Sequence, residues 1–387
     1  MRGSPFLRMS CFATTISGLE RFAAGECKEI IEVEANPDVG KIIFEADLDQ
    51  LVKLNLSSRM LHKIFIMLAR TRVETIEDIH GAASQIDYTE FIEADQTFAV
   101  QGERHSKDKP FTSLDMAAAV GRAIIQSFRE KTGKRLRVNL DNPDVQFYCL
   151  IRDSEFFLGL NTTGKSLHRR FYRVFHHRAA LHPTIAVGMM RIAGWRREHF
   201  ILDPMCGGGT IPIEAALSAI RVPVGARKLN DLALLRLSFI DVERVRAIAE
   251  ELEGEVDFGF KPRIMGTDAS SKSIHGALMN AEKAGVSHLV EFSVRDVFKI
   301  NEWLRNEPDH VIMNPPYGLR MGIRKIREFY EGVCASLADA APSSRLTAIV
   351  SKPGIFSKAL EKAGYSILSK TPVVYGRLNA VIISAER

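Results

Sequence analysis

The chain of 387 residues carries a formal net charge of +5, with 46% hydrophobic and 26% charged residues. These values are ordinary for a globular protein, and the length suffices for two or three domains. No apolar run reaches the roughly 18 to 20 residues that a membrane span needs, and the N-terminus lacks a signal peptide's apolar stretch. We therefore expect a cytoplasmic protein. Five cysteines without a close pair argue against a disulfide framework or a CxxC zinc site.

The first 165 residues mix strand and helix signals and contain no glycine-rich phosphate loop. This predicts an α+β region, and a shift in composition near residues 165 to 180 predicts a domain boundary there. The expected strands are 41–47, 97–105, 135–140 and 147–161, and the expected helices are 47–69 and 113–133.

The C-terminal half alternates strands with helices, which predicts a parallel sheet covered by helices on both faces. Residues 365–387 predict two strands around a turn at Tyr375 and Gly376, so one antiparallel strand should lie near the sheet edge. The segment 220–262 interrupts the alternation and predicts a partly helical insertion. The expected strands are 199–203, 263–268, 289–298, 309–313 and 345–351, and the expected helices are 211–220, 271–285, 326–340 and 354–364.

A glycine turn follows the first of these strands. The strand leads into Asp203, then Gly207, Gly208 and Gly209, and then a helix. Glycines let the backbone turn tightly and let a ligand approach closely. The stretch lacks the lysine of a P-loop and a clean GxGxxG. It fits a dinucleotide, a nucleotide or S-adenosylmethionine, and a plain tight turn is the alternative.

Two further acids end the next two strands. Asp268 is placed to accept the ribose hydroxyls of an adenosine ligand, and Asp296 to accept its adenine amino group. Either acid alone is more commonly a helix N-cap. Together with Asp203 and residues 314–317 they form a series at the carboxyl ends of strands, where open α/β sheets bind ligands.

The loop Asn314-Pro315-Pro316-Tyr317 predicts the chemistry. The exocyclic amine of a nucleobase is a poor nucleophile and needs two acceptors rather than a strong base. The Asn314 side chain and the Pro315 carbonyl supply them, because proline fixes φ and so aims the carbonyl. Tyr317 offers a stacking face for the base, and catalysis is then positioning and electrostatics. A proline-rich turn at a sheet edge is the alternative.

A basic segment, residues 164–178, precedes the catalytic motifs. It interleaves cations with aromatic rings and contains no acid, which suits phosphates and unstacked bases. A solvated charged linker is the alternative, and its three histidines lack the carboxylate or thiol that would suggest a metal. A second cluster follows Tyr317, either to grip a nucleic-acid backbone or as ordinary helix surface. The candidate RNA contacts are Lys165, Arg169, Arg170 and Arg173 in the segment, and Arg320 and Arg324 in the cluster.

These motifs resemble the class I, Rossmann-like, S-adenosylmethionine-dependent amino-methyltransferases. More narrowly, residues 203–216, 266–270, 294–298 and 311–322 are similar to the THUMP-domain RNA guanine-N2-methyltransferases. The N-terminal half is similar too, over 98–124, 140–173 and 177–195. Two departures are the glycine turn, commonly GSGT in the family, and Phe171, where the family usually has glycine.

The resemblance implies a ferredoxin-like region at 1–60, a THUMP RNA-binding domain at 61–165, a basic linker at 166–180 and a methyltransferase domain at 181–387 with a seven-stranded, mostly parallel sheet. It implies a THUMP region that grips the acceptor end of tRNA and a product, N2-methylguanosine, formed on a base flipped from its stack. Neither a metal nor a protein partner is expected. Alternatives are the same reaction on ribosomal RNA, adenine N6 methylation, and a silent cofactor- and RNA-binding protein.

The site residues implied by the resemblance fall into two groups. S-adenosylmethionine, and its product S-adenosylhomocysteine, would bind through the motifs that end the strands, and the guanine amine through the loop after the fourth strand. The cofactor group comprises Asp203, Pro204, Cys206, Gly207, Gly209, Thr210, Asp268, Asp296 and Asn314, and the catalytic group comprises Asn314, Pro315 and Tyr317.

Overall fold

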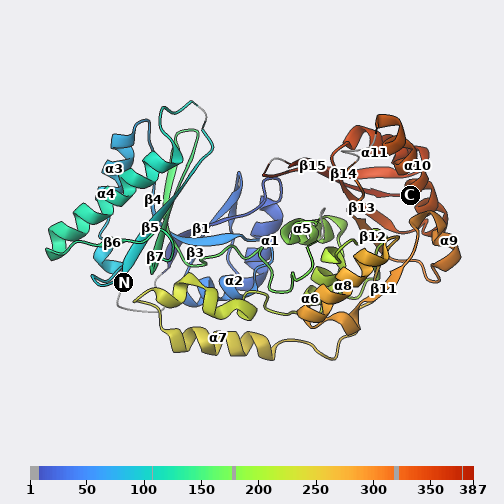
Figure 1. Ribbon diagram of the computed structural model, residues 1–387, viewed down its shortest axis with the longest axis horizontal. Coiled ribbons are helices and arrows are strands. Elements are labelled where there is room, and N and C mark those ends of the chain that lie inside the picture. The colour runs from blue at the N-terminus through green and yellow to red at the C-terminus, as the bar shows by residue number, and fades with distance from the viewer. Residues whose placement is uncertain (1–7, 107, 177–179, 318–321, 377) are drawn as a thin grey trace. The chain divides into compact units, whose positions relative to one another are not determined.

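The computed structural model describes residues 8–106, 108–176, 180–317, 322–376 and 378–387 (Figure 1). These residues form two compact units. None of the described helices is both long enough and apolar enough to cross a membrane. The N-terminal unit comprises the residues up to Thr14, Ala24–Leu167 and Gly225–Glu251, and the C-terminal unit comprises Thr15–Ala23, His168–Val224 and Leu252–Arg387.

The N-terminal unit is built on one eight-stranded sheet in the order β2-β3-β1-β4-β8-β7-β5-β6. Strand β4 pairs antiparallel with β1 on one side and β8 on the other, so it joins the two halves of the sheet. Phe12 of β1 stacks on Phe65 of β4 with 4.7 Å between the ring centroids. The strands are β1 Met9–Thr14, β2 Asn36–Asp38, β3 Lys41–Ala46, β4 Lys63–Arg72, β5 Thr97–Arg104, β6 Arg137–Val138, β7 Val145–Arg152 and β8 Glu155–Asn161.

The helices of this unit include α4, Ser113–Thr132, as predicted. It begins with a capping box between Thr112 and Asp115, and it ends at Gly133 in the left-handed region with φ 73°. Further helices of the unit are α2 Leu48–Ser57, α3 Ile76–Ser84, the short 3-10 helix η1 Tyr88–Glu90 and most of α1 Glu20–Ile31.

The helix predicted over residues 47–69 is wrong in its second half. Helix α2 ends at Ser57, and Lys63–Arg72 forms strand β4. Residues 64–66 are buried in succession, and a short apolar run of this kind fits a helix or a strand equally well. The two neighbouring strands decide the outcome, because they supply hydrogen-bond partners from distant parts of the sequence.

The C-terminal unit contains a seven-stranded sheet in the order β11-β10-β9-β12-β13-β15-β14. The first five strands are parallel, and the terminal hairpin β14–β15 adds β15 antiparallel to β13. The predicted fold class is therefore confirmed. The strands are β9 Ile201–Asp203, β10 Ile264–Asp268, β11 Glu291–Val294, β12 His310–Met313, β13 Arg345–Val350, β14 Ser366–Tyr375 and β15 Leu378–Glu386.

Helices cover both faces of this sheet (Figure 1). The core under α10 and α11 includes Val311 and Met313 of β12 and the rings of Tyr330 and Phe356. This packing fixes the strand that carries the 314–317 loop. One face holds α5 Pro183–Ala193, α6 Thr210–Ala219 and α8 Ser271–Ala284, and the other holds α9 Ile300–Trp303, α10 Ile323–Ala340 and α11 Pro353–Lys362.

The predicted insertion is present between α6 and β10, but Gly225–Glu251 belongs to the N-terminal unit. The backbone amide of Leu234 donates to the Thr162 carbonyl at 2.8 Å, next to strand β8. Long-range bonds of this kind leave no local signal, so the sequence predicted the interruption and not its place. The insertion comprises the short 3-10 helices η2 Ala226–Asp231 and η3 Ala233–Arg236, followed by α7 Val242–Gly254.

The exchange also runs the other way, because Thr15–Ala23 belongs to the C-terminal unit. The amide of Val374 in β14 donates to the Ser17 carbonyl at 3.1 Å. Gly18 has φ +99°, and a Cβ there would lie 1.9 Å from the Pro372 carbonyl oxygen, so only glycine fits. Each unit therefore contains a segment from the stretch of sequence that mainly forms the other.

Candidate active site

The four sequence motifs meet where the parallel strands of the C-terminal sheet end, at their carboxyl ends. This end of the sheet is called the cofactor edge below. They follow β11, β10, β9 and β12, which are adjacent parallel strands, so their carboxyl ends point the same way. Asp203 ends β9 and Asp268 ends β10, with Gly266 opposite Asp203 in the register. Asn314 follows the last residue of β12. The edge is where an open α/β sheet places a ligand.

The glycine turn is held in a conformation that its glycines make possible. Gly207 has φ 53°, and its amide donates to the Asp268 Oδ2 at 3.0 Å. Gly209, at φ 79°, is the N-cap of α6, and a Cβ on it would lie 3.0 Å from the Cβ of Ala277 in α8. The hydrogen bond between Gly207 and Asp268 thus fixes the turn and the second acid relative to each other, and glycines add no side chain that would obstruct a ligand.

The three acids differ in environment. Asp203 is buried, accepts the Met205 amide at 3.2 Å, and has a pKa well above its ordinary value because burial and then the Asp268 charge disfavour ionisation. Asp268 also accepts the Ser270 amide at 2.9 Å. Asp296 is exposed and caps η5, Val297–Lys299, by accepting the Phe298 amide. A carboxylate offers about four lone-pair sites, so Asp268 and Asp296 both keep acceptor capacity.

The other predicted residues of the turn are packed inside. Pro204, Cys206 and Thr210 are all buried. Burial, followed by the charges of Asp203 and Asp268, raises the pKa of the Cys206 thiol well above its usual range. Cys206 is therefore a small packing residue of the turn and not a reactive thiolate.

Hydrogen bonds to the third and fourth carbonyls of the 314–317 loop, those of Pro316 and Tyr317, hold it in place. The Tyr330 hydroxyl donates to the Pro316 carbonyl at 2.9 Å, and the Ser351 hydroxyl donates to the Tyr317 carbonyl at 3.3 Å. Across the described ranges, no hydrogen bond reaches the Pro315 carbonyl. The backbone carbonyl that the sequence assigned to the target amine is thus the one that the fold leaves unused.

Tyr330 and Ser351 were not predicted from the sequence. Tyr330 is fully buried, with its ring edge-on to Phe356 at 5.1 Å between centroids, so its hydroxyl is rigidly placed. Burial raises the pKa of Tyr317 to about 12, so its phenol stays neutral and its ring is the useful part. Asn314 is half-buried at the head of the loop.

The predicted RNA contact at Arg170 is wrong. Its guanidinium donates to both carboxylate oxygens of Glu214 in α6, at 2.8 and 3.2 Å, and the two side chains are 1% and 0% exposed. The hydroxyl of Tyr172 donates to the same carboxylate at 2.8 Å. The Arg170 charge and the Tyr172 ring, both from the basic segment, are therefore buried inside the protein, where a phosphate cannot reach them.

The rest of the bridge segment, residues 170–175, is also bound to the cofactor edge. Asn280 of α8 is buried, and its Oδ1 accepts the amides of Val174 at 3.0 Å and Phe175 at 2.9 Å. Its Nδ2 donates to the Gly208 carbonyl at 2.9 Å. One side chain thus joins the bridge segment to the glycine turn. Glu214 and Asn280 were missed, although a polar residue inside an apolar helical stretch was the available signal.

The remaining basic candidates divide by exposure. Arg173 is half-buried and donates to the Leu181 carbonyl and, at 3.3 Å, to Thr210 Oγ1 at the start of α6. Lys165 and Arg169 are exposed. Arg324 is exposed and pairs with Glu328 at 2.8 Å. Arg320 lies outside the described residues.

Comparison with known proteins assigns the chain to a family. An RlmL ferredoxin-like domain model matches residues 10–65, a THUMP domain model matches 73–161, and an RMKL-like methyltransferase domain model matches 170–380. A tRNA (guanine(6)-N2)-methyltransferase from Methanocaldococcus jannaschii is 34% identical, with 96% of this chain and 98% of the relative covered. The chain belongs to this family of THUMP-containing methyltransferases.

Two further comparisons extend over nearly the whole methyltransferase. A tRNA (guanine(6)-N2)-methyltransferase from Archaeoglobus fulgidus is 36% identical, with 97% of this chain and 92% of the relative covered. The crystal structure of SMU.472, described as a putative methyltransferase complexed with SAH, matches with a TM-score of 0.86 at 19% identity, covering 97% of each chain. At that identity the structural match concerns the fold. The match to the RMKL-like methyltransferase domain begins at Arg170. This start agrees with the hydrogen bonds that join the bridge segment to α6 and α8.

Proposed function

We propose that this methyltransferase transfers a methyl group from S-adenosylmethionine to the exocyclic N2 of a guanosine in tRNA, in the acceptor-stem region. The names of the two archaeal relatives support the substrate. The main structural support for this reaction is the hydrogen bonding of the loop after β12. Its Pro316 and Tyr317 carbonyls accept hydrogen bonds within the protein, while no described hydrogen bond reaches the Pro315 carbonyl, which follows the half-buried Asn314 at the end of β12.

The carboxylates at this edge match the hydrogen-bond donors of S-adenosylmethionine. Asp268 keeps lone pairs for the two ribose hydroxyls, and the exposed Asp296 carboxylate can accept the adenine amine. Asp203 is a buried acid with a raised pKa, and a ligand ammonium beside it would favour its ionised form. The proposed cofactor residues are Asp203, Pro204, Cys206, Gly207, Gly209, Thr210, Asp268, Asp296 and Asn314.

The cofactor supplies a methyl group activated by a sulfonium. The protein's task is to hold the guanine amine in line with it. The Asn314 side-chain oxygen and the Pro315 carbonyl accept the two N–H groups, which become more acidic as the new N–C bond forms, so no strong base is needed. The Tyr317 ring stacks on the base. In a stem, the base must first leave its stack.

We propose a division of labour along the chain. Residues 61–165 bind the tRNA, and residues 181–387 transfer the methyl group, after a ferredoxin-like region at 1–60. Lys165, Arg169 and Arg324 remain as proposed phosphate contacts because their side chains are exposed. We place the protein in the cytoplasm, where tRNA is accessible.

The test is methyl transfer from labelled S-adenosylmethionine to unmodified tRNA and to ribosomal RNA, side by side, with nucleoside digestion of the products. We expect N2-methylguanosine in tRNA alone. The Asn314→Ala variant is the matched control: it should lose about 10²- to 10³-fold in turnover while RNA affinity is retained. N2-methylguanosine in ribosomal RNA would overturn the substrate, label in adenosine would overturn the base, and no label would overturn the activity.

A further inference from the structure

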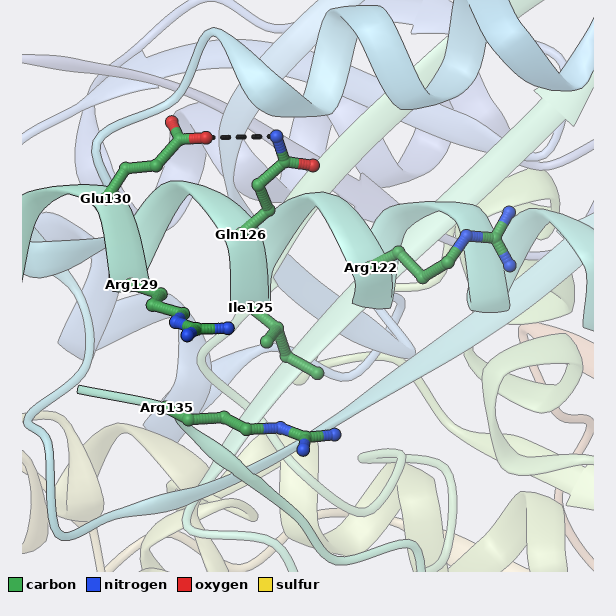
Figure 2. Close-up of a pocket in the computed structure, with 6 residues that line it drawn as sticks. All are labelled: Arg122, Ile125, Gln126, Arg129, Glu130 and Arg135. Atoms are coloured by element: carbon green, nitrogen blue, oxygen red, sulfur yellow. Dashed lines mark hydrogen bonds between the residues drawn. The ribbon is translucent and has the colours of Figure 1, made fainter. Parts of the chain in front are cut away.

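A shallow hollow of about 530 Å³ lies along α4 in the N-terminal unit, and none of its lining residues belongs to the candidate active site. Figure 2 shows its lining side chains, five from α4 and one from the segment that follows it. Residues three, four, seven and eight positions apart share one face of a helix, and the opposite face of α4 is buried. The lining residues are Arg122, Ile125, Gln126, Arg129, Glu130 and Arg135.

The positive charge of this hollow is not compensated. Arg122, Arg129 and Arg135 are exposed, and within the described part of the chain none of them has an ion pair or a side-chain hydrogen bond. Glu130 is the single acid of the lining, and its Oε1 accepts the Gln126 amide at 2.9 Å. The lining therefore contains three cations and one carboxylate.

Neighbouring cations of the same unit behave differently. Lys131 on α4 pairs with Asp87, and Arg137 donates to the Asp95 carbonyl at 2.8 Å. Arg70 pairs with Glu155 across β4 and β8. Within the described part of the chain, the three arginines of the hollow thus differ from these three neighbours, each of which has a partner.

We propose that this hollow binds the phosphodiester backbone of the RNA substrate. The inference rests on the proposed function and adds a contact surface to it. Arginine offers planar, bidentate donation that matches phosphate oxygens. Arg122 and Arg129 are seven residues apart, about 10 Å along the helix axis, so they can contact more than one phosphate.

The composition of the hollow favours RNA over a protein partner. The centre of a protein interface is depleted in charge and rich in apolar and aromatic side chains. Here the single apolar lining residue is the half-buried Ile125, between arginines. Residues 113–135 also lie inside the stretch matched by the THUMP model. A hollow lined by three unpaired arginines suits a polyanion such as RNA.

The test compares two triple variants of the full chain. The first, Arg122→Gln with Arg129→Gln and Arg135→Gln, removes the three guanidiniums of the hollow. The matched control, Arg70→Gln with Arg244→Gln and Arg246→Gln, removes three exposed guanidiniums of the same unit that pair with Glu155, Asp49 and Glu243. Both change the net charge equally, and glutamine keeps good helix propensity.

Affinity is measured for the RNA that the wild type methylates, as a function of salt. Each lost phosphate contact reduces the magnitude of the slope of log affinity against log salt by about 0.7 to 0.9, so the hollow variant should lose about two. We expect an affinity loss of about tenfold to a hundredfold at moderate salt. The KM for RNA should rise while kcat at saturating RNA stays near the wild-type value, and the control should change far less.

The outcomes separate the two proposals. Unchanged affinity and slope in the hollow variant, or an equal loss in the control, would overturn the hollow while wild-type methylation still supports the function. A wild type that neither binds nor methylates RNA would overturn the proposed function, and the hollow with it. Equal S-adenosylhomocysteine affinity and equal melting temperatures in all three proteins confirm that the variants are folded.

Discussion

Arg170 and Arg129 both stand in basic stretches of this chain, and the fold uses them in opposite ways. Arg170 is buried against Glu214 of α6, while Arg129 is exposed in the hollow and forms no ion pair with any residue that the structure describes. The denser basic cluster in the sequence thus contains the less accessible of these two arginines. A count of cations locates charge, but the partners that folding brings to each cation decide whether that charge can reach a ligand.

The largest expected effect comes from breaking the buried pair. Arg170→Met leaves the Glu214 carboxylate buried and uncompensated, which should lower the free energy of unfolding of the C-terminal unit by about 3 to 5 kcal/mol. Arg129→Met should change stability by less than about 0.5 kcal/mol, because its side chain is exposed. Urea denaturation of both variants measures the contrast.

A double variant checks the reason. Arg170→Met combined with Glu214→Leu removes both charges, so it should recover most of the stability lost in the single variant. A double variant as unstable as Arg170→Met would mean that packing, rather than the stranded charge, accounts for the loss.

The next effect concerns the link between the bridge segment and the cofactor turn. Asn280→Ala leaves the amides of Val174 and Phe175 and the Gly208 carbonyl without their side-chain partner. We expect S-adenosylhomocysteine to bind about tenfold more weakly, while RNA affinity stays within about twofold. Calorimetric titration of the cofactor product and filter binding of RNA measure the two. Equal weakening of both affinities would indicate general loss of structure instead.

Asp203 gives a pH-dependent test of the same edge. Its pKa is raised by burial, so its proton stabilises the fold fully below the ordinary pKa of 3.8, and that contribution is lost as the pH rises toward the folded-state value. The amide of Asp203→Asn does not ionise. The melting temperature of the variant relative to the wild type should therefore increase from pH 4 to pH 8.

The same substitution should weaken binding of the cofactor. An uncharged amide cannot balance a ligand ammonium, so S-adenosylhomocysteine should bind about tenfold less tightly to Asp203→Asn near neutral pH. The expected result is a more stable protein with a smaller thermal shift on ligand addition. A full ligand shift in the variant would remove Asp203 from the cofactor site.

The smallest expected effect is at Arg324. It is 91% exposed and paired with Glu328 four residues later, so Arg324→Gln should leave the melting temperature unchanged. If it contacts a phosphate beside the target base, the salt slope of RNA binding should fall in magnitude by about 0.7 to 0.9. An unchanged slope would assign the residue to ordinary helix surface.

The parts of the candidate site that were predictable share a local origin. Asp203 with its glycines, Asp268, Asp296 and residues 314–317 each join a short strand to a turn, and parallel strands bring their carboxyl ends together without further information. Tyr330, Glu214 and Asn280 were missed because their roles depend on what lies beside them. Their contacts join residues 14 to 106 positions apart in the sequence.

The fold shows the same division. The turn and capping residues of α4, Thr112 and Gly133, set its ends as the sequence predicts. Strand β4 was assigned to a helix because its apolar run has no decisive period, and only pairing with β1 and β8 makes it a strand. The insertion was recognised as an interruption, but its membership of the N-terminal unit depends on bonds such as that from Leu234 to Thr162.

The sequence by itself determined the doubly covered parallel sheet, the order of its motifs and the position of the 314–317 loop at the end of a strand, because strand periodicity, glycine turns and proline geometry act over a few residues. Only the tertiary structure decided which charges are available. It placed Glu214 beside Arg170, left Arg122 and Arg129 of α4 without an ion pair among the described residues, and bound the Pro316 and Tyr317 carbonyls but not, within those residues, the Pro315 carbonyl. Burial and ion pairing depend on neighbours distant in sequence, and these exist only after folding.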